Sequence, residues 1–198
     1  MLKIGITGGI GSGKTTVCRV FETLGIPVFY ADTVAKQIMV MDPILVQGVK
    51  DTFGKESYTA EGLLNNKHIA GIVFNQLAEL EKLNQLVHPA VFRAFDKWLA
   101  QVSPNVPYIL KEAALLFESG SYQMCDRNVL VIAPIETRLQ RVMERDGVTE
   151  EQVRARMDKQ LSDEEKAKMA DMLIHNNETD SLITQVMDLH RQFLNITP

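Results

Sequence analysis

A glycine-rich stretch near the start of the chain has the residue types and spacing of a phosphate-binding loop. Residues 8–15 read Gly-Gly-Ile-Gly-Ser-Gly-Lys-Thr and match the pattern G-x-x-x-x-G-K-[ST]. Glycines let the backbone fold around a polyphosphate with N–H groups pointing at its oxygens, and a helix that follows presents its N-terminus to the same anion. The stretch predicts a nucleoside triphosphate site, and a glycine-rich turn without a ligand is a much weaker alternative.

The residues of this loop have different expected tasks. We expect the Lys14 ammonium to bridge the β- and γ-phosphates and the Thr15 hydroxyl to be a ligand of Mg²⁺. The predicted nucleotide-binding residues are Gly9, Ile10, Gly11, Ser12, Gly13, Lys14, Thr15 and Thr16. A GTPase switch is not favoured, because the nearest match to a guanine-reading Asn-Lys-x-Asp motif, residues 66–69, ends in Ile69 instead of an aspartate.

Asp32 is the candidate for handling the proton of an attacking hydroxyl group. It follows the second predicted strand, at the carboxyl edge where open parallel sheets bind ligands. A carboxylate there can accept or orient the acceptor proton in a phosphoryl transfer. Asp32 would also make a good N-cap for a helix starting at Thr33, and the residues alone leave these two interpretations about equal.

Arginines gather in one short segment of an otherwise acidic chain. Of the nine arginines, five lie between positions 138 and 156: Arg138, Arg141, Arg145, Arg154 and Arg156. The first three share one helical face, which favours a lid that clamps phosphate groups. The alternative is a solvated charged face, because glutamates are interleaved with these arginines.

Alternating strands and helices must position these groups. Residues 2–6, 26–29, 108–110, 128–133 and 172–175 are predicted strands. Between and after them, helices are predicted at 15–24, 135–145, 149–160 and 181–194. The region 33–104 lacks strand patterns and is a predicted helical insertion, with helices at 33–41, 43–53, 77–86 and 89–101. The pattern predicts an open α/β sheet of parallel strands.

Length and composition set the protein class. With 198 residues and 45% hydrophobic content, the chain is long enough for a sizeable core and is not disordered. A net charge of −4 argues against nucleic acid and anionic membranes as partners. No apolar run is long enough to span a membrane, no targeting signal is recognised, and the 2 cysteines do not form a disulfide framework. We expect a cytoplasmic protein, with a monomer favoured.

Several motifs in order along the chain resemble the dephospho-coenzyme A kinase family. The resemblance covers nearly the whole chain and rests on residues 6–14, Ala31-Asp32, Phe53-Gly54, Val73-Phe74, Leu83-Asn84, His88-Pro89, residues 115–118, Arg141, Arg145, Arg156, Gln160, Ala170-Asp171, Ile174 and Asn176. The chain departs from the family pattern at Tyr30, Lys36, Asn66, Glu112 and Ala114. These departures bear on acceptor contacts more than on phosphoryl transfer.

The resemblance implies a fold and a reaction. It implies a P-loop NTPase-type sheet formed by residues 1–32 and 105–198, a lid at about 135–160, and an acceptor-binding helical domain at 33–104. It implies that ATP·Mg²⁺ phosphorylates the 3′-hydroxyl of the ribose of dephospho-coenzyme A. The implied catalytic residues are Lys14, Asp32, Arg141 and Arg145, and the implied acceptor-binding residues are Thr7, Asp32, Lys36, His88, Leu116 and Glu118.

Two other functions stay open at this point. One is a phosphate-loop kinase for another small acceptor, which the ordered substrate-domain motifs argue against. The other is a regulator that binds ATP without catalysis, which Asp32 and the arginine-rich segment argue against.

Overall fold

The computed structural model describes residues 1–73 and 76–196, and Phe74 of the Val73-Phe74 motif lies outside them. The chain divides into two compact units, one made of Met1–Tyr30 with Val102–Pro198 and the other of Ala31–Gln101. The first unit contains β1 (Leu2–Thr7), α1 (Lys14–Thr23), β2 (Val28–Tyr30), β3 (Tyr108–Glu112), β4 (Arg127–Ile132), α6 (Ile135–Asp146), α7 (Glu150–Met157), α8 (Asp163–Met169), β5 (Met172–His175) and α9 (Leu182–Asn195). The second contains α2 (Ala31–Met41), α3 (Pro43–Phe53), α4 (Asn66–Val73) and α5 (Leu77–Leu99).

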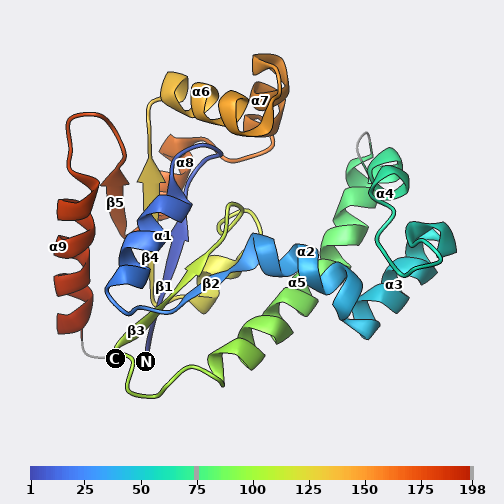
Figure 1. Ribbon diagram of the computed structural model, residues 1–198, viewed down its shortest axis with the longest axis horizontal. Coiled ribbons are helices and arrows are strands. Elements are labelled where there is room, and N and C mark those ends of the chain that lie inside the picture. The colour runs from blue at the N-terminus through green and yellow to red at the C-terminus, as the bar shows by residue number, and fades with distance from the viewer. Residues whose placement is uncertain (74–75, 197–198) are drawn as a thin grey trace. The chain divides into compact units, whose positions relative to one another are not determined.

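A five-stranded sheet organises the first unit (Figure 1). Its order is β2-β3-β1-β4-β5, and every neighbouring pair is parallel. Ile4 of the central strand lies opposite Leu110 of β3, and Ile6 lies opposite Val129 of β4. The predicted open parallel sheet is confirmed, and the carboxyl ends of all its strands meet at one edge.

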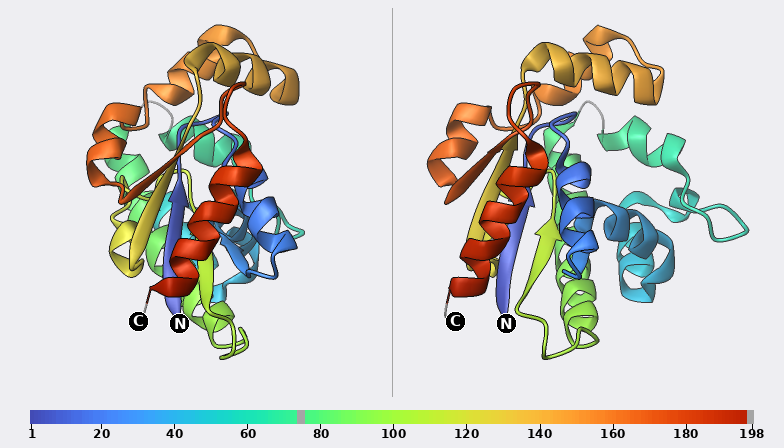
Figure 2. Two further views of the ribbon diagram at one scale, coloured as in Figure 1. Left: turned by 90° about the vertical axis from the view of Figure 1, so that its left-hand side faces the viewer. Right: turned by 60° about the vertical axis from the view of Figure 1, so that its left-hand side comes forward.

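Helices cover both faces of the sheet, which explains why its strands are apolar on both sides (Figure 2). Phe21 of α1 and Phe193 of α9 pack on one face, in a cluster with Ile4, Tyr108 and other buried residues. Helix α8 packs against β4 and covers part of the opposite face. There Gly5 leaves no room for a side chain, because a Cβ would lie 2.7 Å from Leu116 Cδ2.

The helical unit has its own core. Buried side chains of this unit pack together: Met39, Leu45, Val49, Phe53, Tyr58, Ile69 and Ala90. The Asp42 carboxylate caps α3 by accepting from the Ile44 N–H at 2.9 Å and also forms an ion pair with Arg93 at 2.9 Å. The ion pair joins α3 to α5. The helix predicted at 43–53 is confirmed, with Asp42 as its N-cap and Pro43 at its first position.

One prediction for this unit is wrong. The two helices predicted at 77–86 and 89–101 form the single helix α5, with Pro89 inside it. Proline in a helix interior costs about 3 kcal/mol because it removes a hydrogen bond and crowds the preceding turn. The apolar residues Leu83, Leu86, Val87 and Ala90 continue at helical spacing across the proline and pack in the unit's core, which compensates for that cost.

Two helices had no sequence prediction. Helix α8 begins with a capping box in which the Ser162 hydroxyl accepts from the Glu165 N–H at 3.1 Å. In α4, the Asn65 side chain accepts from the His68 N–H at 3.2 Å. The Ser-x-x-Glu spacing at 162–165 is the signal that would have predicted α8.

Candidate active site

The glycine-rich loop lies between the central strand and the first helix, where the pattern placed it. β1 ends at Thr7 and α1 begins at Lys14. Gly11 has φ 79° and Gly13 has φ 95°, left-handed conformations in which glycine avoids the steric cost of a side chain. The N-terminus of α1 therefore opens at the carboxyl edge of the sheet, where helix N–H groups and the helix dipole favour an anion.

Several polar groups of the loop already bond within the protein. Lys14 Nζ donates to the carbonyl oxygens of Gly8 at 2.9 Å and Gly9 at 3.4 Å. The Ile10 N–H donates to Gln160 Oε1 at 2.9 Å, and the Ser12 N–H donates to Gly9 O at 3.1 Å. Phosphate recognition is therefore expected to rely on the loop end at Gly13 and the first turn of α1 more than on the N–H groups of Ile10 and Ser12.

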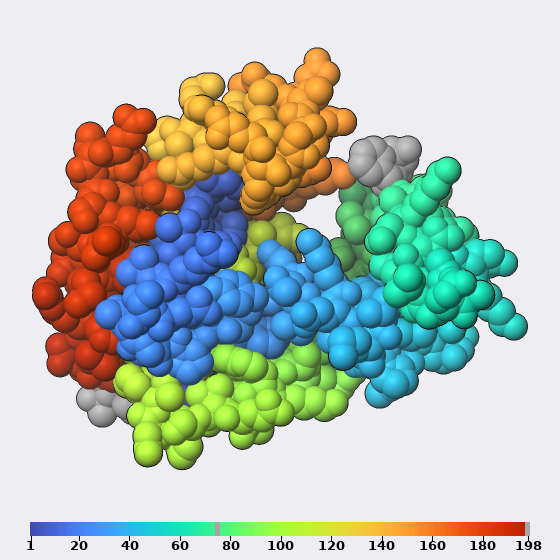
Figure 3. Space-filling model, viewed as in Figure 1, coloured from blue at the N-terminus to red at the C-terminus, as the bar shows by residue number. Residues whose placement is uncertain are grey.

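The arginine-rich helix α6 lies next to the loop, and Figure 3 shows the gold atoms of α6 and α7 adjoining the dark blue atoms of the first residues. Arg141 is exposed, and its NH1 lies 3.5 Å from Gly11 O. Arg145 donates to Asp146 at 2.7 Å, and Asp146 also accepts from Arg156 at 2.8 Å. The hydrogen bond from Arg145, assisted by Arg156, lowers the pKa of Asp146 to about 2. By accepting from Arg145 of α6 and from Arg156 of α7, the Asp146 carboxylate connects the two helices.

Arg138 differs from the other arginines of this segment. It is only 8% exposed, and its guanidinium bonds to Ile10 O at 2.9 Å and Asp163 at 2.9 Å. The expectation that Arg138 belongs to a phosphate-clamping face with Arg141 and Arg145 is therefore corrected. The Arg138 guanidinium bonds on one side to the loop and on the other to Asp163, the first residue of α8.

Glu112 is a candidate site residue that the sequence interpretation did not single out for a role. It ends β3, lies opposite Ile6 of β1 and Tyr30 of β2 in the sheet register, and is 6% exposed. Burial raises the pKa of the Cys18 thiol in α1, and the nearby Glu112 carboxylate adds to that shift. A carboxylate at the end of the strand beside the loop strand is the signal that would have found it.

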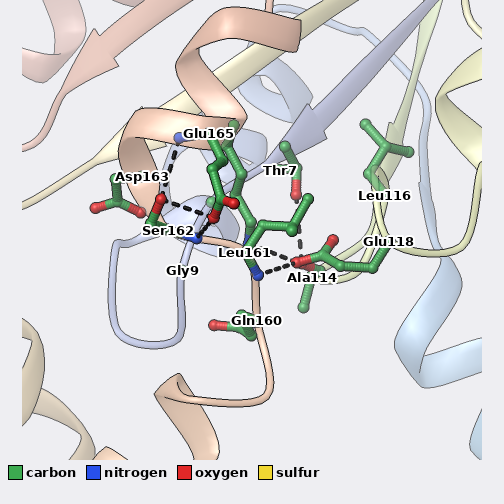
Figure 4. Close-up of polar contacts among 12 residues, drawn as sticks. Thr7, Gly9, Ala114, Leu116, Glu118, Gln160, Leu161, Ser162, Asp163 and Glu165 are labelled. Carbon is green, nitrogen blue, oxygen red and sulfur yellow. Dashed lines mark hydrogen bonds and ion pairs between the residues drawn. The ribbon is translucent and has the colours of Figure 1, made fainter.

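The expected acceptor residues of the first unit have partners within the protein (Figure 4). The Thr7 hydroxyl donates to Ala114 O at 3.4 Å. Glu118 Oε1 accepts from the Leu161 N–H at 3.0 Å and pairs with Lys166 Nζ at 3.0 Å. Leu116 has no exposed surface, so the structure places its side chain in the core and not on an acceptor surface, whereas Leu115 is 42% exposed.

The remaining expected acceptor residues belong to the helical unit. Asp32 and Lys36 are exposed and share one face of α2 at i, i+4 spacing. Because α2 begins at Ala31, Asp32 lies inside the first turn, and the N-cap interpretation is wrong. His88 lies inside α5 and does not precede a helix start, and burial lowers the pKa of its imidazole.

Oxygen ligands suitable for Mg²⁺ flank the loop. Among residues 1–73 and 76–196, no three His, Cys, Asp or Glu side chains converge as a metal site. Mg²⁺ in nucleotide sites is held by one or two protein oxygens together with water and phosphate oxygens. The Thr15 hydroxyl on the first turn of α1 and the Glu112 carboxylate have this chemistry.

Replacing Gly13 by alanine is expected to weaken ADP binding by at least about tenfold, which is about 1.4 kcal/mol. A Cβ at Gly13 would overlap Asn176 Nδ2, and its φ of 95° adds about 1–2 kcal/mol of backbone strain. Gly25→Ala is the matched control, because Gly25 has φ 81° with no atom within 4 Å of its Cβ position. Titration calorimetry with ADP should separate the two variants, and equal ADP affinities would contradict a binding role for this loop.

A parallel sheet with a phosphate loop after its central strand and an arginine-rich helix beside that loop defines a P-loop kinase. The dephospho-CoA kinase family model matches residues 2–181 of this chain. The chain therefore belongs to the dephospho-CoA kinase family. Across the described parts of the chain, no helix combines the length and apolar character needed to cross a bilayer.

Curated relatives and solved structures agree with this family. A dephospho-CoA kinase of Salinibacter ruber is 42% identical over 180 residues, covering 90% of each chain. One of Vibrio vulnificus is 40% identical over 195 residues, covering 98% of this chain and 96% of the relative. A Thermus thermophilus protein of known crystal structure is 34% identical with a TM-score of 0.83, covering 100% of this chain and 98% of its own. The dephospho-CoA kinase of Campylobacter jejuni is 27% identical with a TM-score of 0.68, covering 96% and 95%.

Proposed function

We propose that this chain transfers the γ-phosphoryl group of ATP to the 3′-hydroxyl of the ribose of dephospho-coenzyme A. Family membership makes it an ATP-dependent kinase of coenzyme A biosynthesis. The observation that carries the proposal is the phosphate loop between β1 and α1, with Gly13, Lys14 and Thr15 at the start of the helix. This arrangement supplies phosphate-binding donors at the edge of the sheet where ligands bind.

The loop and α6 supply positive charge to the transferring phosphoryl group. Lys14 reaches back over the loop and is positioned to contact the β- and γ-phosphates once they enter it. Arg141, exposed beside Gly11, neutralises charge that spreads over the equatorial oxygens. Arg145 contributes less directly to the charge around the phosphoryl group than Arg141, because its Nε and NH2 already donate to the Asp146 carboxylate at 2.7 and 3.1 Å.

Asp32 accepts or orients the proton of the acceptor hydroxyl. It follows Tyr30, the last residue of β2, by only two positions. Two residues of chain span at most about 7 Å, so the backbone holds Asp32 near the carboxyl end of that strand. An exposed carboxylate there meets the needs of a general base in phosphoryl transfer.

Mg²⁺ is part of the proposal as the ion that accompanies ATP. Thr15 would hold it directly, and Glu112 would hold it directly or through water. When bound, the ion neutralises phosphate charge during transfer.

The helical unit is proposed to bind the acceptor. We assign this role to the region 33–104, with Asp32, Lys36 and His88 as contacts, and to Glu118 from the sheet unit. Thr7, like Leu116, has no exposed surface, so the expected acceptor contact at Thr7 is not retained. Lys36 keeps a positive charge but lacks the planar fork with which an arginine binds two oxygens at once. The monomeric state, the cytoplasmic location and the absence of a nucleic-acid partner stay predictions from the sequence.

Acceptor-dependent ADP release tests this function. The protein is incubated with ATP·Mg²⁺ and with dephospho-coenzyme A, adenosine, AMP or buffer alone. We expect ADP release with dephospho-coenzyme A well above the other three conditions. Turnover on another acceptor would keep the kinase chemistry and reject this substrate, whereas ATP binding without acceptor-dependent turnover would favour a regulator.

A further inference from the structure

The backbone of Ile10, in the middle of the phosphate loop, is held at its N–H and at its carbonyl oxygen by side chains more than a hundred residues away. The Ile10 N–H donates to Gln160 Oε1 at 2.9 Å, and Ile10 O accepts from Arg138 Nε at 2.9 Å. The Ile10 side chain packs against the small apolar cluster of Leu139, Val142 and Val153. The backbone N–H, the carbonyl oxygen and the side chain of Ile10 are therefore each held by a contact from another part of the chain.

Arg138 is built into the protein beneath the loop. Its side chain is 9% exposed, and its NH1 forms an ion pair with Asp163 at 2.9 Å. The loop glycines make room for it, because a Cβ on Gly9 would overlap the guanidinium and one on Gly11 would lie 2.6 Å from Arg138 O. Because the Arg138 side chain is nearly buried and its guanidinium bonds to Ile10 O and Asp163, it contacts the loop from the protein interior and not from the solvent side.

Gln160 and Asp163 are in turn anchored by a buried ion pair. Lys166 in α8 has no exposed surface, and its Nζ lies 3.0 Å from Glu118 Oε1. The same oxygen accepts from the Leu161 N–H at 3.0 Å, between Gln160 and Asp163 in the chain (Figure 4). Removing one partner of such a pair would leave a buried charge uncompensated, so the segment 160–166 is firmly placed.

We propose that Arg138 and Gln160 are positioning residues that hold the phosphate loop in its nucleotide-binding conformation through the backbone N–H and carbonyl groups of Ile10, without touching the phosphates. A loop with four glycines among six residues has much conformational freedom to lose when it closes on a ligand. Bonds that fix the loop beforehand reduce this cost and raise affinity. The inference rests on the proposed role of the loop as the nucleotide site.

The test measures ADP·Mg²⁺ binding by calorimetry for Arg138→Met and Gln160→Met. We expect the Kd for ADP to rise about tenfold or more for Arg138→Met, and about threefold to tenfold for Gln160→Met, because a charge-assisted hydrogen bond contributes more than a neutral one. Asp163→Leu, which removes the acceptor of Arg138, should weaken binding about threefold, and Asp163→Asn, which keeps an acceptor but removes the counter-charge, should weaken it less. Arg191→Met is the control for losing an arginine, because Arg191 is 69% exposed in α9.

Steady-state kinetics separate a positioning role of Arg138 and Gln160 from a direct role in the phosphoryl transfer step. A positioning role raises the KM for ATP and leaves the KM for dephospho-coenzyme A unchanged. An unchanged Kd for ADP in both Arg138→Met and Gln160→Met overturns the proposal, and so does a loss confined to kcat. If Arg138→Met fails to fold, Gln160→Met and the Asp163 pair decide. Because ADP binding needs no acceptor, failure of the wild type to phosphorylate dephospho-coenzyme A would reject the proposed function and leave this test valid.

Discussion

Asp32→Asn is expected to lower kcat by about 10²- to 10⁴-fold, the usual contribution of a general base. The asparagine has the same shape and still accepts a hydrogen bond, but it cannot take the proton of the acceptor hydroxyl. Asp32 lies in the first turn of α2 and outside the phosphate loop, so the affinity for ADP should change little. Single-turnover phosphorylation of dephospho-coenzyme A, with ADP binding measured in parallel, checks both expectations.

Asp51→Asn is the matched control for this variant. Asp51 is an exposed aspartate of the same helical unit, and its carboxylate accepts a surface hydrogen bond from Gln47 at 2.7 Å. It should keep wild-type turnover. If Asp32→Asn retains a kcat within tenfold of wild type, Asp32 is not the general base.

Arg141→Ala is expected to reduce kcat by about 10³- to 10⁵-fold, the range for an arginine that stabilises a transferring phosphoryl group. Arg141 is exposed beside Gly11 and has no ion pair among those found in the described residues, so its charge is available to a ligand at the loop. The effect should fall on kcat more than on the Kd for ADP, because charge on the equatorial oxygens develops in the transition state.

Arg145→Ala should have a smaller effect than Arg141→Ala. The Arg145 guanidinium already donates twice to Asp146, and the exposed pair is worth little in free energy on its own. Arg191→Ala controls for the loss of one positive charge. Unchanged turnover in both Arg141→Ala and Arg145→Ala would show that α6 does not act on the phosphoryl group.

Local sequence predicted those parts of the site that depend on neighbouring residues alone. The loop from Gly8 to Thr15 needs a strand before it, left-handed glycines within it and a helix after it, and all of these are encoded within about 25 residues. The strand Met172–His175 and the two helices at 135–145 and 149–160, observed as α6 and α7, were also predicted from local patterns. The continuity of α5 was not, because the core contacts that outweigh the cost of Pro89 come from α2, α3 and α4.

The different roles of the three arginines of α6 could not be predicted from the sequence. Arg138, Arg141 and Arg145 share one face by spacing, and nothing in their neighbours tells them apart. In the folded protein, Arg138 lies beneath the loop with Asp163, Arg141 lies at its rim, and Arg145 pairs with Asp146.

The sequence by itself determined the class of site, because glycines, a lysine and a threonine at fixed spacing can bind a polyphosphate through local backbone geometry. It also determined the open parallel sheet, since alternating strands and helices leave few other ways to bury both faces of each strand. Only the tertiary structure decided which residues hold the loop from behind. Those partners, Arg138, Gln160 and Asn176, lie 128, 150 and 164 residues from the loop atoms that they bond, and no local pattern encodes such contacts.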